Sequence, residues 1–200
     1  NSITARFVRH FNIVTYADMS DNSLNLIFRT ILGNFLGVFE EDVQSVSTGI
    51  VTSTIHLFNT ILSELRPTPI TPHYTFNLRD ISKVFQGLLM SDRRKVTTAI
   101  GLGRMWIHEC ERVFGDRLIS FEDKAWLRNE LHKNMEACTD LKAADLWAEK
   151  SDVICCDFMV PGADVTVYEE TDAQELQSMV EEYLGEYNAE SKQPMNLVIF

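Results

Sequence analysis

The residue with the clearest chemical potential in this sequence is Arg79, which the residue pattern places in the first turn of a helix that begins after Asn77. The first turn of a helix carries unpaired N–H groups and a partial positive charge, so a cation there is electrostatically mismatched and an anion relieves the mismatch. A helix N-terminus with an arginine fork suits phosphate, because guanidinium binds phosphate oxygens bidentately. The alternative is an ion pair of Arg79 with Asp80 or a nearby glutamate, which composition alone favours.

Two further arginines, Arg6 and Arg9, precede a short β-rich run at residues 11–16. This run predicts a strand at the edge of a sheet whose remaining strands lie outside the sequence. An arginine at the edge of a nucleotide-binding sheet can reach across a subunit boundary to a phosphate, as an arginine finger does. A solvated basic turn is the alternative interpretation of both residues.

Common catalytic and metal-binding signatures are missing from the sequence. It has no G-x-x-x-x-G-K-[ST], no G-x-G-x-x-G, no H-E-x-x-H and no G-x-S-x-G, and its five histidines are scattered. Residues 108–111 (HECE) contain ligand types, but consecutive helical residues point in different directions, which predicts a solvated face beside a core Cys110. We therefore expect no catalytic residue and no metal site, and four cysteines without a C-x-x-C pair predict reduced, structural thiols.

The charge of the chain is concentrated at one end. The net charge is −11, and residues 151–200 hold 11 acidic side chains against one lysine, a balance of −10 that leaves −1 for residues 1–150. Duplex nucleic acid and anionic membranes are held mostly by Lys and Arg, so neither is expected as a partner. The apolar fraction of 45% is typical of a globular chain, and no apolar run approaches the 18 or so residues that span a bilayer.

Hydrophobic periodicity and capping residues predict a mainly α-helical fold. About five helices are expected at 20–39, 43–65, 77–89, 94–114 and 120–135, with N-caps at Ser20, Asn77 and Ser120. After a boundary near residue 150, strand-like runs at 153–159 and 165–168 and a helix from Asp172 to about 187 predict a small α+β segment. The glycines of Gly101-Leu102-Gly103 fall within a helix and predict close helix packing.

Several motifs resemble the dynein heavy chain. They are ARFVRHFN at 5–12, HYTFNLRD at 73–80 continuing through VFQG at 84–87, WIHE at 106–109, RVFGDRL at 112–118, YEE at 168–170, EYN at 186–188 and PMNLV at 194–198. Their order is similar to the end of the third AAA+ module of the motor ring, its helical lid and the approach to the fourth module. The FNLRD form at 76–80 resembles axonemal chains, which implies a cilium or flagellum as the location.

The resemblance implies a division of the chain and roles for its arginines. Residues 1–18 would be the end of the large α/β subdomain, 19–150 the helical lid, and 151–200 the approach to the next module. Arg79 falls on the position of the sensor II arginine, which contacts the phosphates of its own module, and Arg9 or Arg6 falls near the trans-acting finger. The Walker segments of both modules would lie outside these residues, so the fragment alone is expected to have no ATPase activity.

The resemblance also implies cofactors, partners and a function for the parent chain. The parent would bind ATP or ADP with Mg²⁺, which the fragment alone would not hold tightly, and would drive minus-end-directed movement along microtubules. Its partners would be neighbouring AAA+ modules, microtubules, and dynein intermediate and light chains. The competing hypothesis is a non-catalytic helical interaction module whose acidic last fifty residues dock a basic partner.

Overall fold

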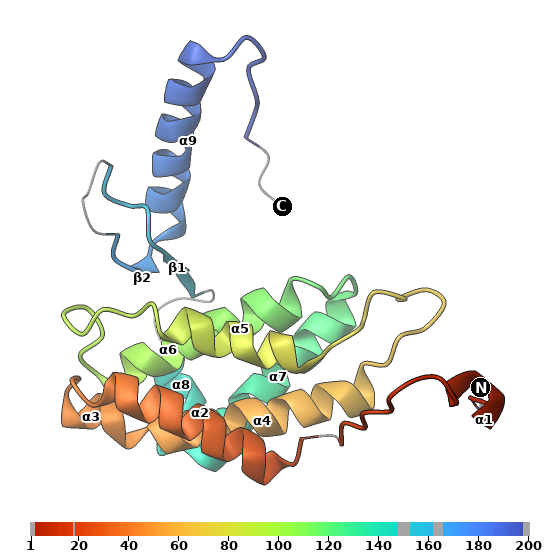
Figure 1. Ribbon diagram of the computed structural model, residues 1–200. Coiled ribbons are helices and arrows are strands. Elements are labelled where there is room, and N and C mark those ends of the chain that lie inside the picture. The colour runs from red at the N-terminus through yellow and green to blue at the C-terminus, as the bar shows by residue number, and fades with distance from the viewer. Residues whose placement is uncertain (1–2, 18, 148–152, 162–165, 198–200) are drawn as a thin grey trace.

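The protein is a helical bundle that carries a small two-stranded sheet and a projecting helix (Figure 1). The structure is a computed structural model and describes residues 3–17, 19–147, 153–161 and 166–197. The main helices of the bundle are α2 (Asp21–Leu36), α3 (Glu41–Ser45), α4 (Ser47–Glu64), α5 (Leu78–Leu88), α6 (Ala99–Cys110) and α7 (Phe121–Cys138). This architecture confirms the predicted mainly α-helical class.

The residues predicted as N-caps lie at the starts of the expected helices. Ser20 Oγ accepts the Ser23 N–H at 3.2 Å at the start of α2, and Ser120 Oγ accepts the Asp123 N–H at 3.0 Å at the start of α7. Each bond satisfies a backbone donor that has no partner inside its own helix. These helices therefore start where short-range sequence signals place them.

The core forms where α4 packs against α2 and α7, while α5 packs on α6. Trp106 of α6 is fully buried, and its indole N–H donates to Thr54 Oγ1 of α4 at 2.8 Å. At Gly49 the backbones of α4 and α7 approach closely, because an added Cβ would lie 2.3 Å from the Cys138 carbonyl oxygen. Gly103 has the predicted packing role, since a Cβ there would lie 2.9 Å from Leu141 and Leu146 side-chain carbons.

Two of the expected helices have different bounds in the structure. The helix expected at 43–65 is divided at Val46 into α3 and α4, and the one expected at 94–114 begins only at Ala99. The later start follows from capping, because Thr98 Oγ1 accepts the Gly101 N–H at 3.1 Å and Asp42 of α3 accepts the Ala99 N–H at 2.7 Å. After Cys110 the helix widens into the π-helical turn η1 (Glu111–Gly115), which ends one residue beyond the expected end of the helix.

The strand expected at residues 11–16 is not formed. A short helix, α1 (Ala5–Val8), precedes extended chain in which Ile13, Val14 and Tyr16 are exposed. A strand requires hydrogen bonds from a neighbouring strand, and none of the described residues provides one beside this segment. The apolar side chains that a sheet would cover therefore remain on the surface, at the end of the molecule marked N in Figure 1.

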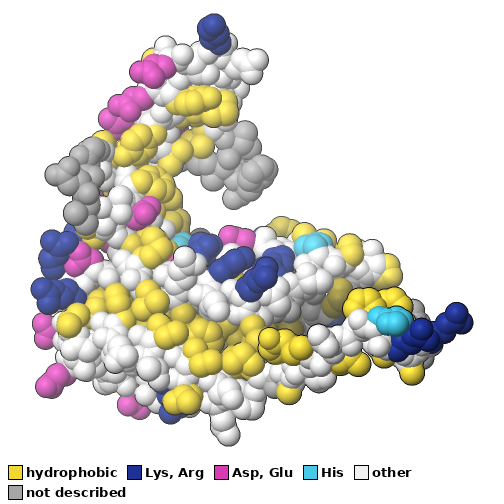
Figure 2. All heavy atoms as spheres, in the orientation of Figure 1, with side chains coloured by type: hydrophobic (Ala, Val, Ile, Leu, Met, Phe, Trp, Pro, Cys, Tyr) yellow, Lys and Arg dark blue, Asp and Glu magenta, His cyan; other side chains and the backbone are white. Residues whose placement is uncertain are grey.

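The C-terminal segment forms an antiparallel pair of strands and one long helix. Strand β1 (Ile154–Cys156) pairs with β2 (Glu169–Thr171), which lies just beyond the run expected at 165–168. Helix α9 (Ala173–Glu190) projects from the bundle and has no buried residue, and Figure 2 shows acidic and apolar side chains on different sides of it. The short helix α8 (Ala143–Leu146) was not expected, and the predicted boundary near 150 lies outside the described residues.

Candidate functional site at the start of helix α5

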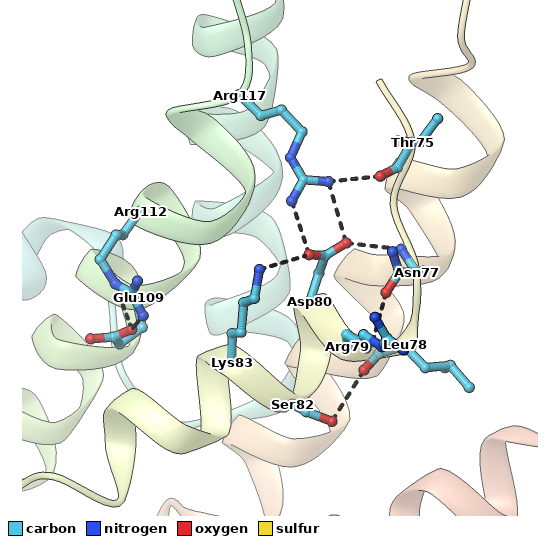
Figure 3. Close-up of polar contacts among 10 residues, drawn as sticks. All are labelled: Thr75, Asn77, Leu78, Arg79, Asp80, Ser82, Lys83, Glu109, Arg112 and Arg117. Atoms are coloured by element: carbon cyan, nitrogen blue, oxygen red, sulfur yellow. Dashed lines mark hydrogen bonds and ion pairs between the residues drawn. The ribbon is translucent and has the colours of Figure 1, made fainter. Parts of the chain in front are cut away.

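A capping box organises the first turn of α5, where Arg79 lies. Asn77 Oδ1 accepts the Arg79 N–H at 2.9 Å, and Asp80 Oδ2 accepts the Asn77 N–H at 2.9 Å (Figure 3). Both bonds hold the backbone of the first turn, while the Arg79 side chain is exposed. The arginine is thus attached to a rigid helix end and points outward.

The carboxylate of Asp80 is buried and already paired with other cations. Arg117 Nη2 donates to Asp80 Oδ1 at 2.9 Å and Lys83 Nζ lies 3.7 Å from the same oxygen, while Arg117 Nη1 donates to the Thr75 carbonyl at 2.7 Å. Burial by itself raises the pKa of Asp80, but the bonds from Arg117 and Asn77 and the charges of Arg117 and Lys83 outweigh it and lower the pKa below 3.8. Asp80 is therefore an anion engaged from two sides.

This arrangement removes the competing interpretation of Arg79. Its guanidinium is exposed and forms no ion pair with the part of the chain that the structure describes, and Asp80 is bound to Arg117 instead. Lys and Arg side chains gather over α5 on the face shown in Figure 2. The start of α5 thus presents an unneutralised guanidinium, which suits a phosphate oxygen. The sensing role of Arg79 stays a prediction.

The other two predicted arginines lie at the N-terminal end of the chain. Arg6 lies in α1, Arg9 follows it, and both are exposed, with Arg9 Nε donating to His10 Nε2 at 2.9 Å. Neither forms a hydrogen bond or ion pair with Arg79 or Asp80 in the described residues. The three predicted site residues are therefore not brought together within this segment, and the finger role also stays a prediction.

The structure places Glu109 differently from the solvated face that was predicted for it. Its side chain is 1% exposed, and its carboxylate accepts hydrogen bonds from Arg112 at 2.6 and 3.0 Å and from the Tyr168 hydroxyl. The sequence contains one indication of this pairing, an arginine three residues after the glutamate, but the second partner, Tyr168, is distant in sequence.

No group of three or more His, Cys, Asp or Glu side chains able to hold a metal ion comes together among the residues described. Within the same limits, no helix is long and apolar enough to cross a membrane.

Comparison with known proteins identifies the family of the chain. The family model described as an AAA+ lid domain matches residues 50–145. Human "Dynein axonemal heavy chain 1" is 39% identical over 220 residues, human "Dynein axonemal heavy chain 6" is 35% identical over 207, and human "Dynein axonemal heavy chain 2" is 36% identical over 200. These matches cover 99–100% of this chain and 4–5% of each relative. The chain belongs to the axonemal dynein heavy chain family.

Membership of the dynein family gives the helical bundle a structural role. The segment spans about 5% of the length of the curated relatives it matches, and the lid match contains Arg79, Asp80, Glu109 and Arg117 but neither Arg6 nor Tyr168. The bundle is thus the AAA+ lid of a dynein heavy chain, which belongs to the cytoskeleton of the ciliary or flagellar axoneme. The acidic docking module is the less favoured interpretation, because the lid match and the dynein identity account for the helices without it.

Proposed function

We propose that this segment is the lid of the third AAA+ module in the motor ring of an axonemal dynein. Residues 1–18 would complete the large subdomain of that module, 19–150 would form its lid, and 151–200 would lead into the fourth module. The order of the sequence motifs supports the choice of the third module. The function of the segment would be to couple the nucleotide state of one module to the conformation of the ring.

The observation that carries this proposal is the unneutralised guanidinium of Arg79 at the start of α5. Because Asp80 is held by Arg117 and Lys83, the Arg79 side chain is available to bind a phosphate oxygen of a nucleotide lying between the lid and the large subdomain. ATP with Mg²⁺ would supply the hydrolysable phosphate, and Arg79 is the residue of this segment that would hold it. A lid that contacts the phosphates differently before and after hydrolysis changes its preferred angle, which biases the ring.

The remaining expectations concern the parent chain as a whole. We propose that it is an ATPase motor that moves toward microtubule minus ends, with neighbouring AAA+ modules, microtubules, and intermediate and light chains as partners. Arg9, or else Arg6, would reach the nucleotide site of a neighbouring module. The 200 residues alone would bind ATP and ADP only weakly and would show no ATPase activity, since the sequence lacks a P-loop. Saturable turnover by the purified segment would contradict that statement.

Substitution of Arg79 in the parent heavy chain tests the proposal. With the other modules disabled in their P-loops, Arg79→Ala is expected to weaken nucleotide binding at this module about tenfold, because charge-assisted bonds from arginine to phosphate are lost. Arg79→Lys should lose less, since it keeps the charge but not the fork. The matched control is Arg93→Ala, which removes an exposed arginine beyond the opposite end of α5.

Fluorescent-nucleotide titration of these heavy chains gives the affinity. Microtubule-stimulated turnover, measured in heavy chains whose other modules are intact, gives the response of the ring. Equal affinity and equal turnover in Arg79→Ala and the control would refute the sensing role. Alanine variants of Arg9 and Arg6 belong in the same series. Removal of an arginine finger is expected to lower turnover at a neighbouring module while the affinity at this module is unchanged.

A further inference from the structure

The buried carboxylate of Glu109 lies where three parts of the chain meet. Gly87 comes from α5, Glu109 and Arg112 from α6 and η1, and Tyr168 from the residue before β2. We call these four residues the Glu109 joint. Glu109 is 1% exposed and Tyr168 is 7% exposed, so the contact between the lid and the C-terminal segment is shielded from water. Such a shielded charge is stabilised only while its partners stay in place.

Gly87 is required for α5 to fit against this carboxylate. A Cβ at position 87 would lie 2.0 Å from Glu109 Cδ and 2.1 Å from Glu109 Oε2. The helix backbone therefore rests directly on the carboxylate, and a displacement of the end of α5 must displace Glu109. Figure 3 shows Glu109 and Arg112 beside the helix that carries Lys83 and Asp80.

Helix α5 connects this joint to Arg79. Asp80 and Gly87 are seven residues apart, which is about two turns, so they lie on the same side of the helix. That side is buried against the core through Ile81, Val84 and Leu88, each 0% exposed. One end of this short helix thus carries the buried carboxylate of Asp80, beside Arg79, and the other end rests on the buried carboxylate of Glu109.

The end of α5 also contacts Tyr168 through the backbone. Ser91, three residues beyond α5, forms a parallel bridge with Tyr168, and its hydroxyl donates to the Leu88 carbonyl at 2.8 Å. Burial, together with the hydrogen bond to Glu109 and its charge, raises the pKa of Tyr168, so its hydroxyl keeps its proton and remains a donor. Tyr168 is therefore joined by its backbone to Ser91, just after α5, and by its side chain to Glu109.

The other contacts of the β1–β2 pair involve a different part of the lid. Arg104 of α6 donates to Glu170 at 2.6 and 2.8 Å, His108 Nδ1 lies 3.0 Å from the Val153 carbonyl, and Lys95 Nζ lies 2.7 Å from Glu169. These contacts hold the strands to α6 and to the turn before it. Tyr168, by contrast, contacts Ser91, which follows α5, and Glu109, against which Gly87 of α5 packs.

We propose that Glu109 and Tyr168 are positioning residues that transmit a displacement of α5 to the β1–β2 segment. The inference rests on the proposed function to the extent that nucleotide would displace α5 through Arg79. It adds the route by which the displacement leaves the lid: from Arg79 along α5, through Gly87 to the Glu109 carboxylate, and from there to Tyr168. Arg112 keeps the carboxylate in place by neutralising it.

The test is hydrogen exchange in the parent heavy chain, measured on peptides that cover 153–161 and 166–171, with and without nucleotide at this module. Tyr168→Phe removes only the hydroxyl, and Glu109→Gln keeps the shape of the side chain while removing its charge. Tyr183→Phe is the matched control, because its hydroxyl donates to the Phe158 carbonyl at 3.1 Å within the C-terminal segment, away from α5. Nucleotide affinity is measured on the same samples.

The wild type and Tyr183→Phe are expected to show a nucleotide-dependent change in exchange over β1–β2. Tyr168→Phe and Glu109→Gln should lose that change while retaining wild-type affinity, and their nucleotide-free exchange over β1–β2 should rise about tenfold. A nucleotide-dependent change that persists in both variants would overturn the inference, as would its absence from the wild type. If Arg79→Ala leaves nucleotide affinity unchanged, the proposed sensing role fails. The rise in nucleotide-free exchange in Tyr168→Phe and Glu109→Gln still tests the Glu109 joint independently of that role.

Discussion

Replacing Arg117 by alanine is expected to destabilise the 200-residue chain more than any exposed arginine substitution. Arg117 donates to both oxygens of Asp80, at 2.9 and 3.3 Å, donates to the Thr75 carbonyl at 2.7 Å, and lies 4.9 Å from the centre of the Phe76 ring. Removing one partner of a buried ion pair costs about 3–5 kcal/mol, because the other charge stays buried without compensation. Arg117 is 25% exposed, so water enters the vacated space, and Lys83 remains nearby.

These considerations reduce the expected loss of unfolding free energy to about 2–3 kcal/mol. In urea denaturation followed by far-ultraviolet circular dichroism, that loss lowers the midpoint by about 1 M. Arg117→Lys should lose less, because it keeps a charge near Asp80 without the bidentate geometry. Arg93→Ala, a substitution at an exposed turn, should leave the midpoint unchanged.

The dependence on pH distinguishes the ion pair from lost packing. The pKa of Asp80 is lowered below 3.8 in the folded chain, so its contribution to stability is present above that pH and is lost as the pH falls through the lowered pKa. The difference between wild type and Arg117→Ala should therefore shrink as the pH falls below about 3.8. A difference below about 1 kcal/mol at neutral pH, or one that stays constant into acid, would refute the electrostatic reasoning.

Two further predictions concern glycines and thiols. Gly49→Ala should cost about 3 kcal/mol, because the new Cβ would lie 2.3 Å from a backbone oxygen of α7, whereas Gly33→Ala, with nothing within 4 Å, should stabilise α2 by about 0.5–1 kcal/mol. Thermal unfolding of both variants checks this, and equal shifts would contradict it. Burial raises the pKa of the Cys110 thiol and raises that of Cys155 to about 12, so iodoacetamide at neutral pH should modify the partly exposed Cys138 before either. Mass spectrometry of peptides gives the order in which the cysteines are modified. A faster reaction at Cys155 than at Cys138 would contradict the prediction.

Much of the fold was predictable because its signals are short in range. The caps at Ser20, Asn77 and Ser120 act within three residues, and the apolar periodicity acts within two or three helical turns, so both are visible in the sequence. The bounds of α6 were missed because Asp42, which accepts its first N–H, lies 57 residues earlier. The strand predicted at 11–16 is not formed, because pairing depends on a neighbour that the described residues do not provide.

The sequence by itself determined the helical class, the placement of Arg79 in the first turn of a helix, and the family resemblance that gave this arginine a possible role. Only the tertiary structure decided which charges are already engaged. Asp80 is bound by Arg117, 37 residues away, and Glu109 by Tyr168, 59 residues away. Pairings across such separations follow from how helices pack rather than from spacing along the chain, because burial makes an unpaired carboxylate costly and the fold alone decides which cation or hydroxyl can reach it.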